Sequence, residues 1–131
     1  MTAGIMGSRN RNPGMLLALL ILFLLVAAGG VTLAVLEARG HAPPLPVGAV
    51  HGVVALTAIV LLVMQDVANP DNHLVNGATL VFMLAAAGGL LLFAFRASRQ
   101  KLPLAVVVLH AAFALTALLL MTIGWIKGVS P

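Results

Sequence analysis

Long apolar stretches separated by short polar connectors make up most of this chain. Hydrophobic runs of about 20 residues lie at about 15–36, 47–67, 73–95 and 104–125. A helix needs about 20 apolar residues to cross the hydrocarbon core of a bilayer. The pattern therefore predicts an all-α fold, a four-transmembrane-helix bundle that forms a single membrane domain over residues 1–131.

The connectors between these runs are short, so each helix should run antiparallel to the one before it. The second and fourth helices then run parallel to each other. Lys and Arg are almost evenly divided between the two sides, with Arg9, Arg11 and Lys127 on one and Arg39, Arg96, Arg99 and Lys101 on the other. The dense basic group in the third connector favours a cytoplasmic position for that side, with both termini outside.

The first apolar run has some features of a secretory signal peptide. Basic residues precede it, and the small residues at 26–28 would suit cleavage. The run continues to Leu36, however, which is longer than a typical signal core. We therefore expect this segment to be retained as a membrane helix.

Composition narrows the classes of function. Hydrophobic residues account for 62% of the chain and charged residues for 8%, and there is no Cys. The lack of Cys excludes disulfides, thiolate metal sites, iron–sulfur clusters and covalently attached haem. The net charge of +4 lies mostly between or beyond the apolar runs, which indicates contact with lipid headgroups and no nucleic-acid binding. No glycine-rich phosphate loop, carboxylate pair or Ser/His/Asp set is present.

The two halves of the chain resemble each other. The sequence AAGG at 27–30 recurs at 86–89, and His51 followed by ALTA at 55–58 recurs as His110 followed by ALTA at 114–117. Both matches have the same offset of 59 residues, and neither needs a gap. We interpret this pattern as two tandem helix-pair repeats, at about 15–67 and 73–126.

Repeats of two helices each insert in the same orientation, related by an axis along the membrane normal. His51 and His110 then lie at similar depths, about 6 and 9 Å into their helices at 1.5 Å per residue. Ala55 and Ala114, four residues further on, share a helix face with them. Glycine pairs on the first and third helices lie at the same level: Gly29, Gly30, Gly88 and Gly89. These residues predict a flat cavity beside two imidazoles.

Two explanations remain open for the histidines and glycines. Small residues are common where membrane helices pack closely, and a single His can serve as a hydrogen-bonding contact between helices. Two ionisable groups at one depth favour paired ligands instead. Zinc or copper normally takes further His, Cys or carboxylate ligands, whereas a b-type haem needs only two imidazoles, a flat slot and cations for its propionates. Such cations are available on the same side of the membrane: Arg39, Arg96, Arg99 and Lys101.

This pattern resembles the haem-binding four-helix bundle of membrane cytochromes b, in which glycines on the first and third helices flank haem and histidines on the second and fourth bind iron. The resemblance extends over nearly the whole chain, but as a pattern of positions without a signature motif. It implies His51 and His110 as iron ligands. Relatives with two haems carry a second His about 14 residues further along each ligand helix, where this chain has Gln65 and Gly124. The resemblance therefore implies one haem b per chain.

Two axial imidazoles leave no open position on iron, so we expect an electron-transfer protein more than a stand-alone enzyme. It would lie in a bacterial cytoplasmic membrane and pass electrons between quinol or a redox partner subunit and a larger complex. The alternatives are a cofactor-free small membrane subunit or carrier, and binding of chlorophyll-type magnesium. A quinone site in the polar second connector is a further hypothesis, although solvated loop residues and a helix cap also explain that stretch. The oligomeric state is left open.

Overall fold

The computed structural model describes residues 13–129, so the tail that contains Arg9 and Arg11 lies outside it. It has four helices and no other regular element in that range: α1 (Pro13–Ala38), α2 (Leu45–Ala68), α3 (His73–Ala97) and α4 (Leu104–Val129). The predicted helices are confirmed. Each observed helix includes the expected run and extends beyond it by a few residues at one end or both.

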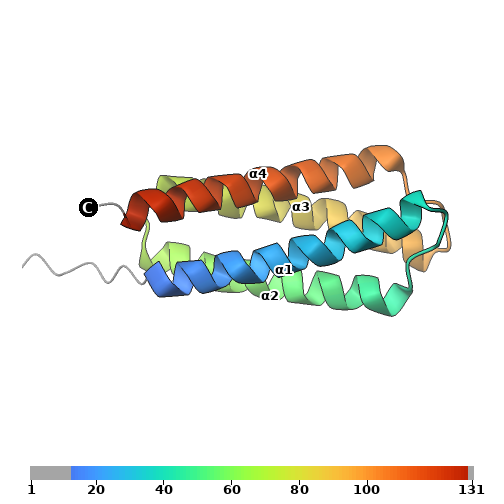
Figure 1. The fold of residues 1–131 in the computed structure, drawn as a ribbon, viewed down its shortest axis with the longest axis horizontal. Coiled ribbons are helices and arrows are strands. Elements are labelled where there is room, and N and C mark those ends of the chain that lie inside the picture. The colour runs from blue at the N-terminus through green and yellow to red at the C-terminus, as the bar shows by residue number, and fades with distance from the viewer. Residues whose placement is uncertain (1–12, 130–131) are drawn as a thin grey trace, which may run out of the picture.

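The helices form an up-and-down bundle in which each contacts its two neighbours (Figure 1). Helices α1 and α3 both pack against α2 and α4, whereas α2 and α4 lie across a diagonal without contact between their backbones. The first connector (39–44) and third connector (98–103) share one end of the bundle, which we call the connector end. The second connector (69–72) and the C-terminus lie at the opposite end.

All four helices are long and apolar enough to cross a membrane. The best 18-residue windows have mean hydropathies of 2.3 to 2.8. Large apolar side chains cover the outside of the bundle, and Leu25 and Leu90 are 66% and 69% exposed. Water would disfavour such a surface, whereas lipid accommodates it. The four apolar helices and their exposed apolar side chains are those of an integral membrane protein.

Most of the buried side chains lie in the half of the bundle nearer the opposite end. At the boundary of this half, the rings of Phe23 and Phe82 stack with centroids 3.9 Å apart and planes 11° from parallel. The buried apolar side chains beside and beyond this stack are Leu16, Leu19, Leu20, Ala58, Ile59, Leu62, Val75, Ala78, Ala117, Leu118 and Met121. Among the described residues of α1, no buried side chain lies closer to the connector end than Phe23.

The C-terminal ends of α1 and α3 have the same geometry. Two residues beyond each helix the backbone is left-handed, at Gly40 with φ 74° and at Arg99 with φ 56°. This conformation commonly terminates helices because it lets the following amides bond back to free carbonyls. The amide hydrogen bonds match at an offset of 59 residues: Gly40 to Glu37 (2.9 Å) with Arg99 to Arg96 (3.1 Å), and His41 to Leu36 (2.9 Å) with Gln100 to Phe95 (2.9 Å).

The N-terminal ends of α2 and α4 match in the same way. Each helix begins directly after a proline, Pro44 or Pro103, which has no amide proton to lose at a helix start. The Pro44 carbonyl accepts a hydrogen bond from the amide of Val47 at 3.0 Å, and the Pro103 carbonyl accepts one from Val106 at 2.9 Å. The first and third connectors therefore enter their second helices in the same way.

Candidate ligand site between the helices

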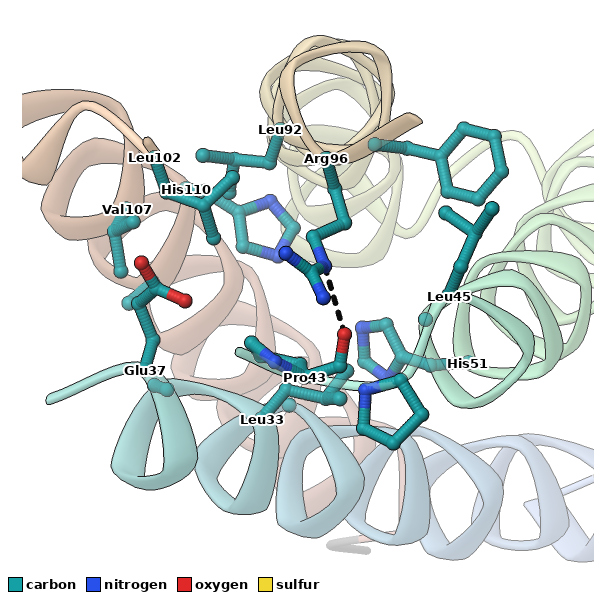
Figure 2. Close-up of a pocket in the computed structure, with 17 residues that line it drawn as sticks. Leu33, Glu37, Pro43, Leu45, His51, Leu92, Arg96, Leu102, Val107 and His110 are labelled. Atoms are coloured by element: carbon teal, nitrogen blue, oxygen red, sulfur yellow. Dashed lines mark hydrogen bonds between the residues drawn. The ribbon is translucent and has the colours of Figure 1, made fainter. Parts of the chain in front are cut away.

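A cavity of about 140 Å³ lies inside the connector end of the bundle (Figure 2). Residues of all four helices line it, together with residues of the first and third connectors. The lining residues that fall into pairs 59 positions apart are Gly30 and Gly89, Leu33 and Leu92, Ala34 and Phe93, Glu37 and Arg96, Pro43 and Leu102, Gly48 and Val107, and His51 and His110. Both halves of the chain thus line one cavity with positions that share the 59-residue offset, and we call it the histidine cavity.

The two histidines enter the histidine cavity from opposite sides. His51 comes from α2 and His110 from α4, the two helices that lie across the diagonal. Figure 2 shows both imidazoles directed into the space between the helices. The rings are close enough to influence each other electrostatically. The structure therefore brings together the two side chains that the sequence placed at one depth.

The glycine pairs lie directly against these imidazoles. A Cβ atom added at Gly30 would be 3.1 Å from Cε1 of His51, and one added at Gly89 would be 3.0 Å from Cε1 of His110. Added Cβ atoms at Gly29 and Gly88 would meet the same two side chains at 3.5 and 3.4 Å. Missing side chains therefore allow α1 and α3 to approach the imidazole rings. Only Gly30 and Gly89 of the four also line the cavity.

The two rings differ in how they are held. Nδ1 of His110 lies 2.7 Å from the backbone carbonyl oxygen of Ala85, to which it can donate a hydrogen bond. That tautomer leaves a lone pair on Nε2. Nδ1 of His51 is buried and has no hydrogen-bond partner, although the backbone of Val26 lies nearby. Val26 precedes Ala85 by the same 59 residues, so the arrangement around the two rings is alike while only His110 is fixed by a hydrogen bond.

Two charged side chains line the histidine cavity. Arg96 donates a hydrogen bond from Nε to the carbonyl oxygen of Pro43 at 2.8 Å, between two of the lining residues (Figure 2). Glu37 also lines the cavity, at the position equivalent to Arg96. Sequence reasoning did not select Glu37, although the 59-residue offset pairs it with Arg96.

Several residues expected at the site lie outside the lining. Among the basic residues only Arg96 lines the cavity; Arg39, Arg99 and Lys101 do not. Ala55 and Ala114 are also absent from its wall, because the cavity extends from the histidines towards the connectors and not deeper into the bundle. The roles of these five residues as cofactor contacts stay predictions.

The chemical donors available at the cavity are few. Within residues 13–129, no group of three or more His, Cys, Asp or Glu side chains could hold a metal ion. The two imidazoles are thus fewer ligands than a zinc site normally uses, but as many as the axial positions of a haem require. Comparison with protein-family models, with curated proteins and with solved structures finds no match to this chain.

Proposed function

We propose that this chain is a membrane b-type cytochrome that holds one haem b between His51 and His110. The observation that carries the proposal is the entry of two imidazoles, from helices across the diagonal, into one cavity. A bound haem would supply one-electron Fe(III)/Fe(II) chemistry. With both axial positions taken by protein, the chain would carry electrons and leave no site on the metal for a substrate.

The hydrogen bond of His110 supports a ligand role. Histidines that bind a metal almost always donate their other ring N–H to a carbonyl or carboxylate, which fixes the ring and raises its basicity. Nδ1 of His110 has such a partner in the Ala85 carbonyl at 2.7 Å. The lone pair of Nε2 is then available as a ligand. His51 would be held mainly by its contact with Gly29 and Gly30.

We further propose that the bundle consists of two tandem helix-pair repeats. The matched ends of α1 and α3, the matched starts of α2 and α4, and the paired lining of the histidine cavity support this division. Phe23 and Phe82, also 59 residues apart, stack against each other, as residues beside a pseudo-two-fold axis would. Such an axis makes His51 and His110 equivalent ligands.

The cavity must enlarge to admit a macrocycle. Its volume of about 140 Å³ is close to that of an engineered cavity that binds a single benzene molecule. The half of the bundle that contains it has little close packing, so α2 and α4 can separate there while the packed half stays intact. Arg96 would then exchange the Pro43 carbonyl for a propionate, because a charged acceptor forms the stronger hydrogen bond.

The proposed protein would function in a bacterial cytoplasmic membrane. It would exchange electrons with quinol or with a redox partner subunit of a larger complex. Arg39, Arg99 and Lys101 lie in or beside the connectors, outside the cavity wall, and would give the connector end a positive surface. A positive surface steers negatively charged partners towards it.

Spectroscopy of the purified chain tests this function. We expect a haem b absorption band, one haem per chain by pyridine haemochrome, and low-spin electron paramagnetic resonance (EPR) signals. His51→Ala and His110→Ala should each remove the low-spin signal, because each removes one axial ligand. His41→Ala and His73→Ala are matched controls, since both side chains are exposed and neither lines the cavity.

The outcomes separate the alternatives. Purification without a chromophore, after expression with ample haem supply, would favour a cofactor-free subunit or carrier. A chlorin band would indicate magnesium binding instead. Full haem content and normal bis-imidazole signals in either cavity variant would show that the assigned ligands are wrong.

A further inference from the structure

A second group of polar residues lies near the opposite end of the bundle and takes no part in the proposed haem site. Three side-chain oxygens there are buried and have no hydrogen-bond partner: Oδ1 of Asp66, Oδ1 of Asn69 and Oδ1 of Asn76. Leaving such an atom unsatisfied is costly, so unpaired buried acceptors usually mark a bound water, ion or ligand.

These residues lie where α2 ends and α3 begins. Asp66 of α2 lies near the hydroxyl of Thr79 on α3. Asn69 caps the C-terminal end of α2, and Asn76 in the first turn of α3 donates a hydrogen bond to the carbonyl of Pro70, the residue after Asn69. The contact between α2 and α3 therefore carries two successive polar layers, Asp66 with Thr79 and Asn69 with Asn76.

The donors in these layers already have partners. Nδ2 of Asn69 donates to the Gln65 carbonyl at 3.2 Å, and Nδ2 of Asn76 donates to the Pro70 carbonyl at 2.8 Å. The Thr79 hydroxyl donates to the Val75 carbonyl at 3.1 Å, which leaves its oxygen free to act as an acceptor. The groups that remain without a donor in these layers are side-chain oxygens, and one of them belongs to a carboxyl group, that of Asp66.

We propose that Asp66, Asn69 and Asn76 form a binding site for one monovalent cation of the sodium type. Carboxylate, amide and hydroxyl oxygens are the ligands that hard cations prefer. A single positive charge neutralises the single carboxylate, and a neutral site is the least costly at the edge of an apolar bundle.

Water and calcium fit these three oxygen acceptors less well than a monovalent cation does. One water molecule can donate only two hydrogen bonds, which is too few for three acceptors, and it leaves the carboxylate charge unbalanced. Calcium usually takes more than one carboxylate among its six to eight oxygen ligands. Among the described residues, the other ionisable side chains near this end are Asp71, His73 and Lys127, and all three are exposed. This inference does not depend on the proposed haem.

Thermal unfolding of the purified full-length chain in detergent tests the site. Melting in sodium chloride is compared with melting in choline chloride at the same ionic strength, so that the cation alone differs. At sodium concentrations about tenfold above the Kd, binding to the folded state should raise Tm by about 5 °C. Asp66→Asn should abolish this difference because it removes the charge with little change of shape. Asp71→Asn, which alters an exposed acid on the nearby second connector, should retain it.

A second variant covers the case in which Asp66→Asn does not fold. Asn76→Ala should raise the sodium concentration needed for half of the Tm shift at least tenfold. Equal Tm values for the wild type in both salts would overturn the proposal. So would an equal sodium shift in Asp66→Asn, or a shift produced by calcium chloride and not by sodium chloride.

Discussion

The two imidazoles of the histidine cavity depend on residues that have no side chains. The His51 ring lies against Gly30 and the His110 ring against Gly89. A Cβ atom at these glycines would be only 3.1 and 3.0 Å from the Cε1 atom of the adjacent ring. Cβ contacts this close are rare in proteins, so a methyl group at either position must displace the ring or the helix behind it. The ring positions are therefore set from α1 and α3 as well as from the helices that carry the histidines.

Gly89→Ala tests this dependence. The added methyl group should push His110 away from the Ala85 carbonyl and lower haem content several-fold, with membrane insertion unchanged. Gly52→Ala is the matched control, because it adds the same methyl group next to His51 where nothing lies within 4 Å. Haem content per mole of protein is the measurement. Equal haem content in the two variants would contradict the proposed role of the glycine.

For individual residues, the sequence predicted that the histidines and glycine pairs lie at one level, but not which atoms of these residues contact each other. The 59-residue offset brought both histidines and both glycine pairs to one level. That the glycines face a macrocycle stays a prediction; the structure places them against the imidazoles. Side-chain rotation decides these contacts, and rotation depends on packing partners that a single sequence does not reveal. The Ala85 carbonyl could not be foreseen for the same reason, since every residue has one.

Helix packing shows where backbones approach most closely. A Cβ at Gly124 of α4 would be 2.8 Å from Cγ2 of Val75 on α3, in the closely packed half of the bundle. The Asn72 side chain bonds the Gly124 carbonyl at 3.4 Å across the same contact. This contact therefore has no room for additional volume.

Gly124→Ala should destabilise the bundle by about 1–3 kcal/mol, the usual cost of overfilling a packed interface. Gly77→Ala is the control on α3, because nothing lies within 4 Å of an added Cβ there. The control should be neutral or stabilising by up to about 1 kcal/mol, since Ala is a better helix former than Gly. Denaturant unfolding in mixed micelles measures both. A Gly124→Ala variant as stable as the control would show that α3 and α4 can readily separate.

The elements themselves were largely predictable. Apolar runs defined the four helices to within a few residues at each end, because the length of a span is set by membrane thickness. Which faces of the helices pack together could not be predicted as well, since helices that are apolar on every side have no polar face to orient them. Asp66 and Asn76 were assigned to a polar second connector, explained either by a quinone site or by solvated loop residues and a helix cap. Only the antiparallel pairing of α2 and α3 brings them together with Asn69.

The whole molecule has a distinct charge pattern at its connector end, and this pattern predicts its orientation. We expect the first and third connectors to face the cytoplasm. The chain contains no Cys, so single cysteines can report on each side without background labelling. Ala42→Cys and Ser98→Cys should react with an impermeant maleimide only after cells are opened, whereas Pro70→Cys should react in spheroplasts. The reverse pattern would place the basic end outside.

The stacked rings of Phe23 and Phe82 limit how deeply a ligand can bind in the bundle. The cavity opens on the connector side of this stack, and close packing fills the other side. A full crossing of the membrane costs or releases about 2.3 kcal/mol per elementary charge at 100 mV. In the proposed cytochrome, an electron that enters or leaves the cavity through the connector end would cover only part of that distance. Its transfer would therefore sense only a fraction of the transmembrane voltage.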